Sequence, residues 1–207
     1  MSENDQTNSE TEKSEQERNE QERNEQERNE RHKKKAQKQK EKVDASIAKA
    51  TIERGIVIVI TGNGKGKSTS GFGTVARCVG HGYKAAVAQF IKGQWDCGER
   101  NLLEANGVPF AVMATGFTWE TQDRSGDIAA AESVWQEAKK FLADPQYHVV
   151  LLDEMTYMLG YDYLNKQEVL DAIRNRPENQ TVVITGRGAI SELKELADTV
   201  SEVKDEK

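Results

Sequence analysis

Residues 61–69 carry the side chains best suited to chemistry in this chain. They read Thr-Gly-Asn-Gly-Lys-Gly-Lys-Ser-Thr and follow an apolar run that resembles a strand. Closely spaced glycines let successive backbone N–H groups turn toward one centre, and the N-terminus of a following helix adds a partial positive charge there. In such a loop Lys67 would reach phosphate oxygens and the Ser68 hydroxyl would bind a magnesium ion. The pattern therefore predicts a nucleotide site.

The loop differs by one residue from the P-loop pattern Gly-x-x-x-x-Gly-Lys-Ser/Thr. Thr61 stands where the first glycine belongs, so the span from Gly62 to Gly66 is one residue short. A glycine-rich turn before a charged helix start is the alternative, but the strand–loop–helix context favours nucleotide binding.

A second set of polar residues follows the apolar run 149–152. Asp153 and Glu154 end this run, which is how P-loop proteins place an acid beside magnesium. Because ligands bind at the carboxyl ends of parallel strands, we expect this edge to face the glycine-rich loop. In a hydrolase Glu154 would polarise water, and an acid at a helix start is the structural alternative.

Two further motifs carry weaker signals. Residues 165–168 read Asn-Lys-Gln-Glu, which is close to the guanine-reading Asn-Lys-x-Asp, but the final Glu and the helical context argue against that role. Residues 185–188 read Thr-Gly-Arg-Gly after an apolar run. Here Arg187 either delivers a guanidinium to phosphate or is a surface residue in a turn, and both interpretations remain open.

The elements that must position these residues alternate between apolar runs and helix-like segments. This alternation predicts an α/β fold, a P-loop NTPase-like parallel sheet flanked by helices. The predicted strands cover residues 56–61, 84–90, 110–114, 148–152, 181–185 and 199–203. The predicted helices cover residues 67–80, 100–107, 125–143, 166–174 and 190–197.

The N-terminal region has a different composition from the rest. Residues 1–32 carry eleven acids and five bases and repeat Glu-Gln-Glu-Arg-Asn three times, which predicts a disordered or transiently helical charged leader. Residues 33–54 are expected to form a helix with one narrow apolar edge at Val43, Ile47 and Ala50. Residues 55–207 would form the α/β domain.

Composition also excludes several classes of function. The formal net charge is -6, and residues 50–207 are acidic on balance, so no nucleic-acid partner is expected. The longest apolar runs are too short to cross a bilayer and no apolar targeting segment begins the chain, which predicts a cytoplasmic protein without membrane contact. Cys78 and Cys97 make no plausible zinc set with the scattered histidines and are expected to be reduced thiols.

Taken together, residues 33–204 resemble the P-loop type of ATP:corrinoid adenosyltransferase. In that family the shortened loop is normal, and the string Met-Ala-Thr-Gly-Phe-Thr-Trp-Glu-Thr at 113–121 is the most specific match. Further matching segments are 62–68, 72–82, 89–93, 98–104, 152–154, 161–164, 185–188 and 197–202.

The resemblance implies that the 5′-deoxyadenosyl group of ATP is transferred to the cobalt of a reduced corrinoid, with release of triphosphate. It implies Mg²⁺ on Ser68 and Glu154, with Lys67 and Glu154 as catalytic residues. Phe117 and Trp119 would press on the lower corrinoid face and exclude a cobalt ligand, although two core aromatics are the alternative. The residues implied at the nucleotide are Gly62, Asn63, Gly64, Lys65, Gly66, Lys67, Ser68, Thr69, Arg77 and Arg187.

The resemblance further implies a homodimer, in which the helix at 33–53 packs over the site of a neighbouring subunit, and a reduced flavoprotein as electron donor. A family tail beyond residue 202 contributes to the corrinoid end of the site and is expected to be short here. Two rival functions stay open at this point. One is a P-loop ATPase or small-molecule kinase that uses Glu154 as base, and the other is a non-catalytic nucleotide- or corrinoid-binding module.

Overall fold

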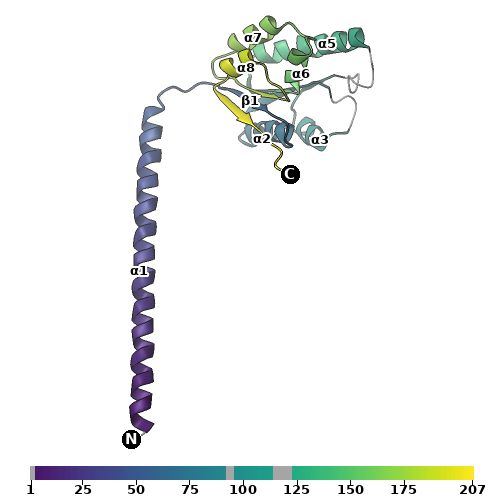
Figure 1. Cartoon of the computed structure of the whole chain (residues 1–207). Coiled ribbons are helices and arrows are strands. Elements are labelled where there is room, and N and C mark those ends of the chain that lie inside the picture. Colours follow the sequence, from purple (N-terminus) through teal and green to yellow (C-terminus); the bar gives the residue numbers. More distant parts are fainter. Residues whose placement is uncertain (1–2, 92–95, 114–122) are drawn as a thin grey trace. The chain divides into compact units, whose positions relative to one another are not determined.

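The computed structural model describes residues 3–91, 96–113 and 123–207, and the chain divides into two units, Met1–Glu53 and Arg54–Lys207. The first unit is the helix α1, Glu3–Lys49 (Figure 1). Its described side chains are all exposed. Glu, Gln, Lys and Arg favour helices intrinsically, and pairs such as Glu27 with Arg31, 3.6 Å apart, add a little support. The helix runs without a break past residue 32, and the division there into leader and separate helix stays a prediction.

The second unit is built on one six-stranded sheet in which every pairing is parallel. The strand order is β3-β2-β4-β5-β1-β6, so β5 lies between β1 and β4. The predicted α/β class is thereby confirmed. The strands are β1 Val57–Thr61, β2 Lys84–Gln89, β3 Phe110–Val112, β4 Tyr147–Asp153, β5 Thr181–Thr185 and β6 Thr199–Glu202.

The described helices of this unit agree with the predicted ones to within two residues at each end, with one addition. The addition is α6, which has six residues and follows β4 directly. Too few turns are present in such a segment for a helical period to appear in the sequence. The helices are α2 Lys67–Gly80, α3 Gly98–Ala105, α5 Arg124–Ala143, α6 Met155–Gly160, α7 Lys166–Arg174 and α8 Ser191–Leu196.

Helices cover both faces of the sheet (Figure 1). On one face α2 and α3 pack against strand residues such as Val149 and Leu151. On the other face α5, α6, α7 and α8 pack against the alternate residues, such as Val150 and Leu152. Trp135 of α5 is 2% exposed within this second core, which confirms its predicted core position. Among the described residues, no helix combines the length and apolar character that a membrane span requires.

Candidate functional site

The glycine-rich loop joins β1 to α2 and is shaped by a close approach of the C-terminal segment. Val203 donates its N–H to the Thr61 carbonyl at 2.7 Å. Gly62 has φ +107°, and a Cβ there would lie 2.3 Å from the Val203 carbonyl oxygen. Glycine is therefore required at 62 both by backbone conformation and by the lack of space.

The Gly64 N–H departs from the arrangement predicted for a phosphate loop, in which successive N–H groups turn toward one centre. It donates to the Val203 carbonyl at 2.8 Å, so this donor has a protein acceptor and does not join the neighbouring N–H groups at one centre. A Cβ at Gly64 would lie 2.7 Å from the Lys204 carbonyl oxygen. The cause is the chain beyond β6, which continues beside the loop. No local signal in residues 61–69 announces this pairing, and binding of nucleotide by Gly64 stays a prediction.

Lys67 opens α2 and lies inside the loop. It is 7% exposed, and its Nζ donates to the Gly64 carbonyl at 2.6 Å. Burial lowers the pKa of Lys67, and Glu154 opposes that shift, while Arg187 and Lys65 lower the pKa further. The structure thus brings three predicted site residues, Lys65, Glu154 and Arg187, within electrostatic reach of Lys67.

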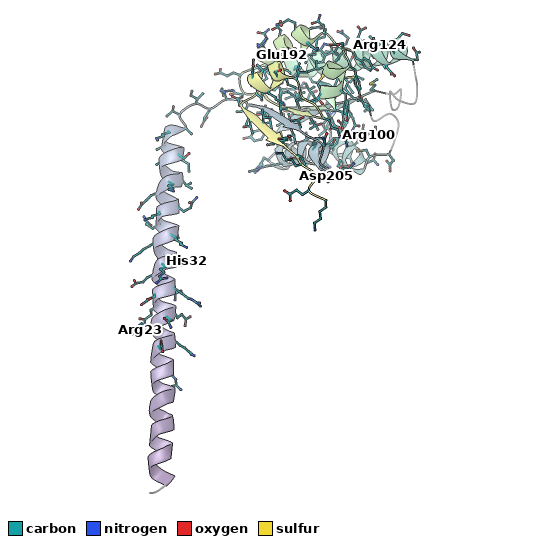
Figure 2. All side chains as sticks on the ribbon, in the orientation of Figure 1. Arg23, His32, Arg100, Arg124, Glu192 and Asp205 are labelled. Carbon is teal, nitrogen blue, oxygen red and sulfur yellow. The ribbon has the colours of Figure 1, made fainter. Side chains whose placement is uncertain are left out.

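A carboxylate from the chain terminus joins this charge cluster. Asp205 raises the pKa of Lys67, although less than Glu154 does. Figure 2 shows Asp205 on the segment that follows β6. Sequence reasoning did not select Asp205, because the approach of residues 203–205 to the loop is visible only in the folded chain.

The two acids at the end of β4, Asp153 and Glu154, have separate environments. Asp153 is fully buried and accepts hydrogen bonds from Gln89 Nε2 at 3.1 Å and Thr185 Oγ1 at 2.7 Å. Glu154 is half-buried and has a left-handed backbone, with φ 59° and ψ 20°, immediately before α6. Glu154 raises the pKa of Lys67, so the two charges lie within electrostatic reach of each other. The Asp153 carboxylate is thus used in internal hydrogen bonds, while the role of Glu154 in the site stays a prediction.

Arg187 lies in the exposed turn after β5, next to the strand that carries Glu154. The Thr156 hydroxyl donates to the Arg187 carbonyl at 2.7 Å. Burial and then Glu154 raise the pKa of Tyr157, while Arg187 lowers it, so both charges lie within electrostatic reach of the Tyr157 side chain. Tyr157 was not selected from the sequence, although it lies only three residues after Glu154, in the first turn of α6.

The donor set fits a magnesium ion that arrives with the nucleotide. Ser68 lies in the first turn of α2, next to Lys67, and the Glu154 carboxylate acts electrostatically on Lys67. Within residues 3–91, 96–113 and 123–207, no three or more His, Cys, Asp or Glu side chains gather into a possible metal site. Mg²⁺ is usually held by one or two carboxylates together with substrate phosphates and waters. A hydroxyl and a carboxylate beside a phosphate loop satisfy that requirement.

Other predicted residues are not brought into this cluster. Asn63 and Thr69 are exposed on the loop and the first turn of α2. Arg77 is exposed in the last turn of α2. At 1.5 Å per residue Arg77 lies about 15 Å along the helix from Lys67, so its contact with nucleotide stays a prediction. Phe117 and Trp119 lie outside the described residues, and their roles stay predictions as well.

Comparison with known proteins decides the family. The family described as ATP:corrinoid adenosyltransferase BtuR/CobO/CobP matches residues 53–207. The chain belongs to this family. The match covers the glycine-rich loop, both acids at the end of β4 and the turn at 185–188, and it confirms the family expected from the sequence.

Curated relatives agree with this assignment. A corrinoid adenosyltransferase of Escherichia coli K12 is 62% identical over 164 residues, which cover 79% of this chain and 84% of that protein. Corrinoid adenosyltransferase CobA of Salmonella typhimurium LT2 is 60% identical with the same coverage. A corrinoid adenosyltransferase of Pseudomonas aeruginosa is 51% identical over 163 residues, 78% of this chain and 80% of that protein.

Proposed function

We propose that this family member transfers the 5′-deoxyadenosyl group of ATP to the cobalt of a reduced corrinoid and releases triphosphate. The observation that carries the proposal is the family match over residues 53–207. The gathering of Lys65, Lys67, Glu154 and Arg187 at one edge of the sheet supports it, because a triphosphate needs such a cluster.

The reaction balances as a displacement at carbon. The Co(I) electron pair of the substrate forms a bond to C5′ of ATP, and the bond from C5′ to its oxygen breaks. That oxygen leaves with the triphosphate, and the cobalt is formally oxidised to Co(III). Negative charge develops on the leaving group, so donors aimed at the triphosphate stabilise the transition state more than the ground state.

Lys67 is the residue best placed to supply that stabilisation. Its ammonium donates to the Gly64 carbonyl at 2.6 Å, and a triphosphate oxygen is a stronger acceptor for the same donor. Burial is the main cause that lowers the pKa of Lys67, and Arg187 and Lys65 add to it. A bound polyanion raises that pKa again, which keeps the ammonium charged at the moment of transfer.

Ser68 and Glu154 are the residues that would hold Mg²⁺. When bound, the ion neutralises triphosphate charge and orients its oxygens. The protein's own part is to keep the Glu154 carboxylate within electrostatic reach of Lys67. We assign Arg187 to the phosphate as well, and its electrostatic effect on Lys67 supports this assignment.

The corrinoid end of the proposal rests on Phe117 and Trp119. We assign them to the lower corrinoid face, where apolar side chains keep water or the lower base off the cobalt and so ease reduction to Co(I). A reduced flavoprotein is the proposed electron donor, and the proposed setting is the cytoplasm.

A homodimer belongs to the same proposal. Within unit Met1–Glu53 the apolar residues Val43, Ile47 and Ile52 are 44%, 65% and 77% exposed. An apolar edge on an otherwise charged helix favours a partner surface. We assign this edge to the site of a second subunit.

An anaerobic assay tests the proposal. The protein is mixed with Mg·ATP and chemically reduced cob(I)alamin, the corrinoid spectrum is followed, and triphosphate is resolved from orthophosphate. Adenosylcobalamin and triphosphate are expected in equal amounts over many turnovers. Orthophosphate release indifferent to corrinoid would favour the ATPase or kinase. Binding of product in a one-to-one ratio to the protein, without multiple turnovers, would favour the non-catalytic module.

A further inference from the structure

The turn after β5 is bonded to the strand end that carries the acids. Thr185 Oγ1 donates to Asp153 Oδ1 at 2.7 Å and accepts from the Glu154 N–H at 3.0 Å. Thr156 Oγ1 donates to the Arg187 carbonyl at 2.7 Å. Two threonine hydroxyls therefore join this turn to the junction of β4 and α6.

The same turn is also bonded to the glycine-rich loop on its other side. The Gly186 N–H donates to the Ile60 carbonyl at 3.2 Å, and the Ala189 N–H donates to Thr61 Oγ1 at 3.2 Å. This follows from the strand order, in which β5 lies between β4 and β1. Residues 185–189 thus form a bridge, which we call the β5 turn, between the acid and the loop.

Packing around the β5 turn leaves little freedom. Thr185 is fully buried and Thr156 is 1% exposed. A Cβ at Gly186 would lie 2.1 Å from Thr156 Oγ1 and 3.2 Å from Glu154 Oε2. Buried hydroxyls with fixed partners are costly to remove, because each partner then loses its bond without gaining water.

The bond to Thr185 bears directly on Glu154. A residue with a side chain rarely adopts φ near +59°, so surrounding contacts must hold Glu154 in this conformation. The Thr185 hydroxyl does so at the Glu154 N–H, and Asp153 fixes the direction of that hydroxyl. Gln89 holds the other oxygen of Asp153 at 3.1 Å.

We propose that the β5 turn is a positioning device for the triphosphate site. In it, Thr185 fixes the backbone of Glu154 and Thr156 fixes the backbone of Arg187, so that both charged side chains start from fixed places relative to the loop. Both threonines are positioning residues that act through the backbone of another residue. The proposal rests on the proposed function for the identity of the ligand.

Calorimetric titration of inorganic triphosphate at a series of Mg²⁺ concentrations tests the Thr185 half. Thr185→Val removes the hydroxyl at nearly constant volume and is expected to raise the Mg²⁺ midpoint about tenfold or more, as loss of a residue that orients a metal ligand does. Thr185→Ser keeps the hydroxyl and is expected to stay within about twofold of the unmodified protein. A midpoint unchanged in Thr185→Val overturns the proposal.

Thr181→Val is the matched control. Thr181 lies at the other end of the same strand, where its Oγ1 accepts from the Ile56 N–H at 3.3 Å. This variant makes the same chemical change in β5 far from the site, so its Mg²⁺ midpoint is expected to stay unchanged. An equal shift in Thr181→Val and Thr185→Val would mean a general effect on the strand and would overturn the positioning role.

A double-mutant comparison separates positioning from packing. In a Glu154→Gln background, Thr185→Val is expected to add no further loss of triphosphate affinity, because both changes act through one carboxylate. Additive losses would overturn the proposal.

The Thr156 half has its own readout. Thr156→Val is expected to weaken triphosphate binding about tenfold at saturating Mg²⁺ while leaving the Mg²⁺ midpoint unchanged. If circular dichroism shows Thr185→Val to be unfolded, Thr156→Val decides, and unchanged triphosphate affinity then overturns the proposal. None of these titrations contains corrinoid. A failure to form adenosylcorrinoid would therefore refute the proposed function without changing the interpretation of the triphosphate and Mg²⁺ titrations.

Discussion

Lys67 is the residue at which the charges of the site converge. Its ammonium is buried, bonded to the Gly64 carbonyl, and within reach of Glu154 and Arg187. The motif at 61–69 was sufficient to predict that Lys67 begins a helix directly after a glycine-rich loop, because spacing within a loop is a local property. The contacts of Gly64 with Val203 and Lys204 were not predictable, because they join residues about 140 positions apart and depend on how far the chain continues past β6.

Replacing Lys67 tests its catalytic assignment. Lys67→Met is expected to lower kcat by about 10² to 10³, the usual cost of losing one donor to a developing charge. Lys84→Met is the matched control, because Lys84 lies at the opposite end of the sheet and bonds Gln146 at 3.0 Å. Steady-state formation of adenosylcorrinoid measures both variants. Equal kcat values in the two would contradict the assignment.

Gly62 offers a second test at this scale. Gly62→Ala adds both a left-handed strain and a contact at 2.3 Å with the Val203 carbonyl. Gly82→Ala adds the strain alone, because Gly82 has φ +81° and nothing within 4 Å of its Cβ position. Urea unfolding is expected to show a loss of about 1–2 kcal/mol for Gly82→Ala and about 1–3 kcal/mol more for Gly62→Ala. Equal losses of unfolding free energy in the two variants would mean that Val203 does not hinder a side chain at position 62.

At the scale of elements, hydrogen bonds to Asp198 connect the start of β1 to the start of β6. Its carboxylate accepts from the Arg54 guanidinium and, at 2.9 Å, from the Val57 N–H. Strands and long helices were predictable because apolar runs and helical periods are local. The helix α6 and this ion pair were not, since six residues show no period and Arg54 pairs with a residue 144 positions away.

Asp198 predicts a specific dependence of stability on pH. The Arg54 hydrogen bond, followed by that from Val57, lowers the pKa of Asp198 below its ordinary 3.8. The carboxylate therefore contributes stability above about pH 4, and that contribution is lost as the pH falls through the lowered pKa. Asp198→Asn is expected to cost about 1–2 kcal/mol at pH 7, since the pair is partly exposed and screened.

Urea unfolding at pH 7, 5 and 3 checks this expectation. The difference between the unmodified chain and Asp198→Asn should persist at pH 5 and shrink by pH 3. A difference that stays constant over this range would show that Asp198 acts by packing and not by charge.

At the scale of the whole molecule, the chain consists of a charged helical unit and an α/β unit. The sequence predicted three parts, a leader at 1–32, a helix at 33–54 and an α/β domain at 55–207, and that three-part division stays a prediction. The aromatic string at 113–121 pointed to the family, yet its packing follows from no periodicity, so the corrinoid end remained a matter of resemblance.

Two deletions test the roles proposed for the N-terminal region. Removal of residues 1–32 is expected to leave both turnover and thermal midpoint unchanged, because those residues lack an apolar edge. Removal of residues 1–53 also takes away Val43, Ile47 and Ile52 and is expected to lower turnover with corrinoid while the thermal midpoint changes by only a few degrees. Sedimentation is expected to show a dimer for the first variant. Equal turnover in both would contradict the assignment of this helix to a neighbouring subunit's site.

The central claim is that the bond broken in ATP is the one between C5′ and its oxygen. Anaerobic turnover in water enriched in ¹⁸O, followed by mass spectrometry of the phosphate products, tests this most directly. Displacement at carbon predicts triphosphate without solvent oxygen, formed one for one with adenosylcorrinoid. Solvent ¹⁸O in released orthophosphate or triphosphate would show attack at phosphorus and would contradict the claim.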